Sequence, residues 1–210
     1  RALYGGGEVF KIIPNGINCA DFEFNQNTRA QVRESLGLGD SFVIGHIGRF
    51  VKIKNQSFLT ETLNLLLKED KNIKLMFIGT GELEEEVKNK AEEMGIKDNV
   101  LFMGLRKDAN RLLQAMDIFA LPSVHEALPL SALEAQAAGL PCLFTEILTK
   151  EMDIFKCSYL PLKQEVWKDE ISKFKTLSAD RAQGAAAVRK AGYDAKEAAE
   201  ILFKIYKGAK

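Results

Sequence analysis

Short apolar runs alternate with amphipathic stretches along this 210-residue chain, and the alternation constrains the fold more than any other feature. Charged and apolar residues repeat between the runs with the spacing of helices. Because the runs are apolar on both faces, helices are expected to cover both sides of a parallel sheet. The pattern predicts an α/β fold with a Rossmann-like doubly wound parallel sheet of about six strands. The expected strands cover 9–13, 42–48, 74–78, 100–103, 118–121 and 142–144, with a weaker one at 159–160.

Capping residues and glycines place the helix ends. The first helix is expected at 28–36, with Thr28 as its N-cap and Gly37 as its stop. The last one, 195–207, is expected to pack through Phe203 and Tyr206. Other helices are expected at 55–68, 82–94, 111–115, 130–138, 167–177 and 179–191. Residues 1–8 are interpreted as the remnant of a preceding domain or a linker, and 9–210 as one domain with C-terminal helices.

Charge and composition exclude several classes of protein. Lys plus Arg number 29 and Asp plus Glu also 29, which argues against a protein that coats nucleic acid. No apolar run approaches the roughly 18 residues of a membrane span. Three widely spaced cysteines and two histidines make neither a disulfide framework nor a zinc site. These features fit a cytoplasmic protein, and no metal is expected.

Ligands of doubly wound sheets bind at the carboxyl ends of the strands, so functional residues are expected in the loops that follow the strands. Gly79-Thr80-Gly81 stands where a dinucleotide fingerprint would begin. Its third glycine is replaced by Glu84, and neighbouring glutamates would repel a pyrophosphate. The sequence also has no P-loop motif. A tight strand-to-helix turn is therefore the favoured interpretation of these glycines.

Cations follow the strand at 42–48. Gly48 permits a close backbone approach, Arg49 offers a fork of donors to phosphate oxygens, and Lys54 adds a compact charge. Taken alone, these residues fit ordinary surface cations equally well. Their position at the carboxyl end of a strand favours a phosphate site.

Two glutamates lie in and after the loop that follows 118–121. Glu126 lies in the loop, and Glu134 lies in an otherwise Ala-rich helix, where a carboxylate needs a partner. The amides near Leu128 to Ser131 form a helix N-terminus that suits an anion. The alternative is an exposed Glu126 and a Glu134 that caps a neighbouring loop. His125, which directly precedes Glu126, is a weaker candidate for substrate contact. His46 is expected in the core.

Glu126 and Glu134, with seven residues between them, resemble the E-x7-E signature of the retaining GT-B glycosyltransferases of family 4, or group 1. The nearest look-alikes are bacterial capsular or exopolysaccharide glycosyltransferases. The resemblance covers roughly residues 9 to 207. Further blocks in the same order are Pro14-Asn15-Gly16-Ile17, Gly48-Arg49-Phe50 with Lys54-Asn55, Ile78-Gly79-Thr80-Gly81-Glu82-Leu83, the segment 100–104 and the segment 115–123.

The resemblance implies the nucleotide-sugar donor-binding half of such an enzyme, the C-terminal half of a GT-B fold. Arg49 and Lys54 would bind the diphosphate, Glu126 would face the donor sugar, and Glu134 would bind the ribose. The backbone at Leu105 and Arg106 would hold the base, and Gly48 with the amides of Leu128, Leu130 and Ser131 would complete the phosphate site. No cofactor is implied beyond the nucleotide-sugar itself, with UDP the favoured nucleotide.

The implied partners are the N-terminal domain of the same chain and a glycan or lipid-linked acceptor of polysaccharide biosynthesis, at most peripherally at the inner face of the membrane. The half alone is expected to bind a nucleotide and transfer nothing. Ala127 stands where the family usually has Gly, and Asn18 where it usually has Asp. A degenerate, non-catalytic nucleotide-sugar-binding domain and a GT-B epimerase therefore stay open as alternatives.

Overall fold

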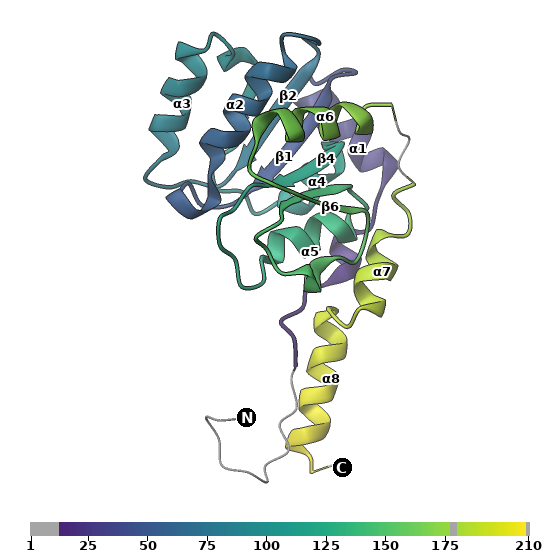
Figure 1. The fold of residues 1–210 in the computed structure, drawn as a ribbon. Coiled ribbons are helices and arrows are strands. Elements are labelled where there is room, and N and C mark those ends of the chain that lie inside the picture. Colours follow the sequence, from purple (N-terminus) through teal and green to yellow (C-terminus); the bar gives the residue numbers. More distant parts are fainter. Residues whose placement is uncertain (1–12, 177–179, 209–210) are drawn as a thin grey trace, which may run out of the picture.

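A single parallel sheet organises the computed structural model, which describes residues 13–176 and 180–208 (Figure 1). Its strand order is β3-β2-β1-β4-β5-β6, the order of a doubly wound dinucleotide-type sheet. This confirms the fold class predicted from the alternating pattern. The strands are β1 (Phe42–Ile47), β2 (Ile73–Ile78), β3 (Val100–Phe102), β4 (Ile118–Leu121), β5 (Cys142–Thr145) and β6 (Cys157–Leu160).

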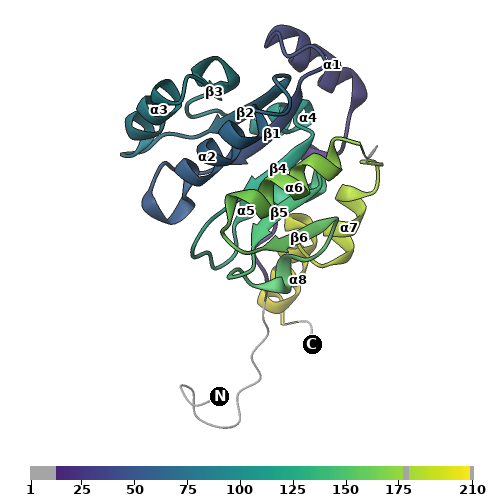
Figure 2. The ribbon, with the colours of Figure 1, turned by 45° about the horizontal axis from the view of Figure 1, so that its top comes forward.

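Helices cover both faces of the sheet (Figure 2). One face packs on α1 (Gln26–Ser35), α4 (Ala109–Ala115) and α5 (Leu130–Ala137). The other packs on α2 (Gln56–Leu66), α3 (Glu84–Glu93) and α6 (Gln164–Phe174). Large side chains such as Phe77, Phe119 and Phe144 are buried completely, each contributing about 1.5–3 kcal/mol by leaving water. These two cores fix the sheet, and thereby the positions of the loops at its carboxyl edge.

The C-terminal part carries two more helices. Helix α7 (Gly184–Lys190) contacts α5, and α8 (Ala195–Tyr206) extends away from the sheet (Figure 1). Phe203 and Tyr206 were expected to pack, and this prediction is wrong within residues 13–176 and 180–208. Their exposed fractions there are 59% and 85%. Among all the residues that the structure describes, no helix combines the length and apolar character needed to cross a membrane.

The start of α1 and the N-terminal segment differ from the predictions. Helix α1 is capped by Asn25, whose side chain accepts a hydrogen bond from the Thr28 amide, so the prediction of Thr28 as N-cap is wrong by one turn. Gly37 ends the helix at a φ of +62°, as expected. Residues 1–8 and most of the expected strand at 9–13 lie outside the described residues.

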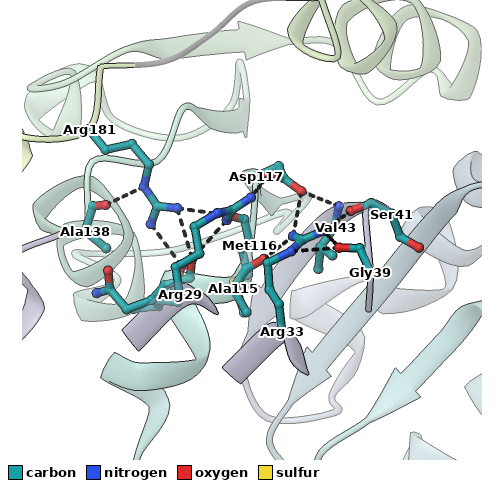
Figure 3. A network of polar contacts seen from close by, with 12 residues as sticks. Arg29, Arg33, Gly39, Ser41, Val43, Ala115, Met116, Asp117, Ala138 and Arg181 are labelled. Carbon is teal, nitrogen blue, oxygen red and sulfur yellow. Dashed lines mark hydrogen bonds and ion pairs between the residues drawn. The ribbon is translucent and has the colours of Figure 1, made fainter. Parts of the chain in front are cut away.

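Three arginines stabilise the amino edge of the sheet, and Figure 3 shows their polar contacts. The guanidinium groups of Arg29, Arg33 and Arg181 donate to carbonyl oxygens at the end of α4, which have no partner inside the helix. Asp117 pairs with Arg29 at 2.5 Å and with Arg33 at 3.3 Å. Burial lowers the pKa of Arg181 to about 9, which leaves it charged at neutral pH. The network ties α1, α4 and the segment before α7 together.

Candidate functional site

The topological switch point of the sheet lies between β1 and β4. These strands pair through only two residue pairs, Ile44 with Ile118 and Gly45 with Phe119. Beyond Gly45 the ladder stops, and the chain leaves β1 and β4 toward opposite halves of the sheet. Doubly wound sheets bind ligands in the crevice that opens at such a point.

His46 lies at the base of this crevice. Its Nδ1 donates to the carbonyl oxygen of Ala120 at 2.9 Å, because a carbonyl can only accept. The ring is fully buried beside Phe77 and Phe119, and burial lowers its pKa to about 4, so it is neutral. Its Nε2 has no partner among the described residues. The prediction that His46 belongs to the core is confirmed.

The loop after β1 carries the predicted cations. The Gly48 amide donates to the carbonyl of Ile78, and Lys54 ends a short 3-10 turn, Lys52–Lys54. A Cβ on Gly48 would lie 3.1 Å from His46 Nε2 and 3.2 Å from Lys54 Cδ, so the lysine stem crosses this glycine. Arg49 is exposed on the same loop. Gly48, Arg49 and Lys54 therefore lie on one loop, as predicted.

Two residues to which the sequence analysis gave no role hold this loop in shape. Gln56, 2% exposed, donates from its side chain to the carbonyl oxygen of Arg49 at 2.9 Å. Asn55 adopts a φ of +55° and donates to the carbonyl of Pro122 at 3.4 Å. The available signal was the tolerance of Asn for the left-handed region, just before a helix. Both residues restrict where Arg49 and Lys54 can point.

The glycines after β2 let two loops touch. Gly79 has a φ of +131°, and a side chain there would collide with the carbonyl oxygen of Gly48. A side chain at Gly81 would collide with the backbone of Phe50. The interpretation of this segment as a tight strand-to-helix turn is confirmed, because both glycines serve close backbone contact.

A cleft of about 560 Å³ opens beside this contact. Its volume is that of a small-molecule pocket. Leu105, with an exposed fraction of 84%, and Arg106 form the side that follows β3. Arg106 is held by two hydrogen bonds of 2.7 Å to Asp108. The predicted Leu105, Arg106, Gly48 and Arg49 thus line one cleft, together with Ile47, Ile78, Gly79, Thr80, Gly81 and Ala109.

The loop after β4 brings Glu126 to the same edge. Its Oε1 lies 2.5 Å from Lys54 Nζ, although the two residues are 72 apart in the chain. The Glu126 side chain is 13% exposed, so the alternative of a solvent-exposed glutamate is wrong. The amide of Val124 donates to the carbonyl of Ile53 at 2.9 Å, which fastens this loop to the one after β1.

Helix α5 begins directly after Pro129. Its first amides, those of Leu130 and Ser131, have no partner inside the helix, and Leu128 immediately precedes the turn. Glu134 lies one turn further along and is half-buried, and burial raises the pKa of its carboxyl. In residues 13–176 and 180–208, no group donates a hydrogen bond to that carboxylate, so it caps no loop there.

The loop before α5 includes Ala127, where the resembling family usually has Gly. Among the non-glycine residues that the structure describes, positive φ is confined to Asn55 and Lys156. Ala127 is therefore not strained by a left-handed backbone.

Another hollow, of about 440 Å³, lies at the amino edge. Its lining includes Arg29 and Arg33, whose guanidinium groups already bind Asp117 and backbone carbonyls. The carboxyl-edge cleft is thus the better candidate, since Arg49 there has an exposed cation beside open space. No cluster of three or more metal-ligating side chains gathers within the described part of the chain.

Comparison with known proteins shows to which family the chain belongs. The family described as Glycosyl transferases group 1 matches residues 28–178. EpsF of Bacillus subtilis is 28% identical over 98% of this chain and 56% of its own length. The UDP-Gal:alpha-D-GlcNAc-diphosphoundecaprenol alpha-1,3-galactosyltransferase of Escherichia coli is 33% identical over 70% of this chain and 39% of its own.

A solved structure, that of Anabaena HepE in complex with UDP and glucose, superposes with a TM-score of 0.74. At 19% identity this similarity concerns the fold, and it covers 93% of this chain and 56% of HepE. The chain spans about half the length of the curated relatives it matches. It belongs to the group 1 glycosyl transferases and corresponds to the C-terminal domain of their GT-B fold.

Proposed function

We propose that this chain is the donor-binding half of a retaining glycosyltransferase that uses a nucleotide-sugar, with UDP as the nucleotide. The observation that carries the proposal is the ion pair of Lys54 with Glu126 across the switch point. On the same loop as Lys54, Arg49 lines a cleft of about 560 Å³. The E. coli relative is named for a UDP-galactose donor, and HepE was solved with UDP and with UDP-glucose. The acceptor is a glycan or lipid-linked sugar of polysaccharide biosynthesis.

The site divides among the parts of the donor. The base lies in the cleft against Leu105 and Arg106, and the ribose reaches Glu134. The diphosphate lies between Arg49, Lys54 and the first amides of α5, where the positive end of the helix dipole stabilises an anion. Glu126 accepts hydrogen bonds from hydroxyls of the sugar. Each assignment matches the charge of the protein group to the chemistry of the donor.

Retention of configuration follows if the acceptor hydroxyl attacks the anomeric carbon on the face that the diphosphate leaves. The bond from that carbon to the diphosphate oxygen breaks, the bond to the acceptor oxygen forms, and the acceptor proton passes to the departing diphosphate. Negative charge grows on the leaving group, and Arg49, Lys54 and the α5 amides are positioned to stabilise it. Removing one such donor typically lowers the rate by about a hundred- to a thousandfold.

Calorimetric titration of the chain tests the nucleotide site. UDP, GDP, ADP and NAD would be titrated without metal into the wild type and into Arg49→Ala. We expect saturable binding of UDP that weakens at least tenfold in the variant. Lys175→Ala, which removes a cation at the amino edge, is the matched control and leaves the UDP affinity unchanged. Equal binding of UDP by Arg49→Ala and wild type contradicts the proposed site.

Transfer itself requires the full-length protein. There, Lys54→Ala is expected to reduce turnover about a hundredfold, because the leaving diphosphate loses a cation. Radiolabelled transfer from UDP-sugars to an acceptor extract measures this effect. Unchanged turnover would overturn the assignment of Lys54 to the diphosphate.

A further inference from the structure

The ion pair between Lys54 and Glu126 joins the two loops on either side of the switch point. Nζ and Oε1 are 2.5 Å apart, and the side chains are 19% and 13% exposed. Within the described residues, neither side chain makes another ion pair. A partly buried ion pair is screened less than an exposed one, and separating it is costly unless each charge finds a new partner.

The two halves of a nucleotide-sugar treat this pair differently. The diphosphate attracts Lys54 but offers nothing to Glu126, whose carboxylate then lies unpaired beside a second anion. The sugar brings hydroxyl groups, which donate to a carboxylate in charge-assisted hydrogen bonds. The intact donor can therefore satisfy both members of the pair, whereas the free nucleoside diphosphate satisfies only Lys54.

We propose that the Lys54–Glu126 pair makes the site discriminate between the intact nucleotide-sugar and the spent nucleoside diphosphate by exchange of partners. This inference rests on the proposed function. Before binding, each residue is the partner of the other. With the donor bound, Lys54 takes the diphosphate and Glu126 takes the sugar. After transfer the sugar hydroxyls leave, Glu126 competes again for Lys54, and the hold on the nucleoside diphosphate weakens.

The variant Glu126→Gln separates this exchange from simple loss of a contact. Its amide oxygen can still accept a hydrogen bond, but without the charge that competes for Lys54. UDP is therefore expected to bind Glu126→Gln about tenfold more tightly than it binds wild type. The sugar hydroxyls lose a charged acceptor in Glu126→Gln. Of UDP-glucose and UDP-galactose, the one that binds wild type more tightly is therefore expected to bind this variant more weakly than it binds wild type. A residue that only supported the fold could not produce two effects of opposite sign.

Two controls isolate the mechanism. Glu146 is exposed in the loop after β5 at the same edge, so Glu146→Gln removes an equal charge and measures general electrostatics. Its effect on UDP is expected to stay within twofold. The double variant Lys54→Met, Glu126→Gln completes a cycle with Lys54→Met. In the absence of Lys54, Glu126 has no partner to compete for, so replacing it raises UDP affinity only by the lost charge repulsion and by less than about threefold.

Isothermal titration of all five proteins with UDP and with the UDP-sugar gives the result, with thermal melts confirming that each is folded. A gain of more than threefold in UDP affinity, confined to Glu126→Gln in the presence of Lys54, supports the exchange. A smaller gain, a loss, or an equal gain for UDP and UDP-sugar overturns it while leaving the proposed function in place. Failure of the wild type to bind either ligand overturns the proposed function and this inference together.

Discussion

Acidification tests the burial of His46 at the base of the crevice. Its imidazole is fully buried and its pKa is lowered from the ordinary 6.5 to about 4, first by burial and also by the nearby charge of Lys54. Between these two values the unfolded chain binds a proton that the folded chain does not. The free energy of unfolding must therefore fall as the pH is lowered through this window.

The size of the effect follows from the shift. A lowering from 6.5 to about 4 corresponds to about 3 kcal/mol over the whole window. About 2 kcal/mol of this is lost between pH 7 and pH 5. Glu134 acts in the opposite direction, because burial raises its pKa, but its contribution is common to wild type and variant and cancels between them.

Urea denaturation at pH 7 and pH 5 measures the loss in wild type and in His46→Gln, whose amide can still donate to Ala120. The wild type should lose about 2 kcal/mol more than the variant on acidification. His125→Gln is the matched control, because it removes an exposed imidazole and leaves the buried one of His46 in place. An equal loss in wild type and His46→Gln would refute the account of a neutral histidine in the crevice.

Three further outcomes are expected. Gly79→Ala should lower the free energy of unfolding in urea by at least about 2 kcal/mol, because its Cβ would collide with the carbonyl oxygen of Gly48 and its φ would be strained. A smaller loss would contradict the close contact between Gly79 and Gly48. Arg181→Met should lower the free energy of unfolding by about 3 kcal/mol in the same assay, because it leaves buried carbonyls without donors. The UDP affinity of the folded variant should equal that of wild type. A reduced affinity would show that the amino edge affects the site. UDP affinity should be the same with and without EDTA, since Arg49 and Lys54 supply the positive charge; a marked loss in EDTA would require a metal.

The sheet could be predicted from the sequence because its cause is local. Apolar runs bounded by glycine and proline specify buried strands, and the glutamates and cations fall in the loops that follow them. That Lys54 and Glu126 touch could not be predicted from spacing, because their contact depends on β4 lying beside β1. Strand order is a property of the whole core, which no single segment encodes.

The supporting interactions escaped prediction for a related reason. Gln56 reads as an ordinary helix-start residue, yet it is buried under Arg49. Arg29 and Arg181 resemble surface cations, but they bind carbonyls that lie tens of residues away in sequence. The cap of α1 was misplaced because both Asn25 and Thr28 are good capping residues, and only the backbone geometry decides between them.

The central claim is that a nucleoside diphosphate binds at the carboxyl edge, between the loops after β1 and β4. Amide chemical shifts of the isotopically labelled chain, followed during a UDP titration, test it most directly. The account predicts saturable shifts concentrated at 48–54, 105–106 and 126–134. Shifts concentrated instead around the hollow of Arg29, Arg33 and Lys175 at the amino edge would contradict it.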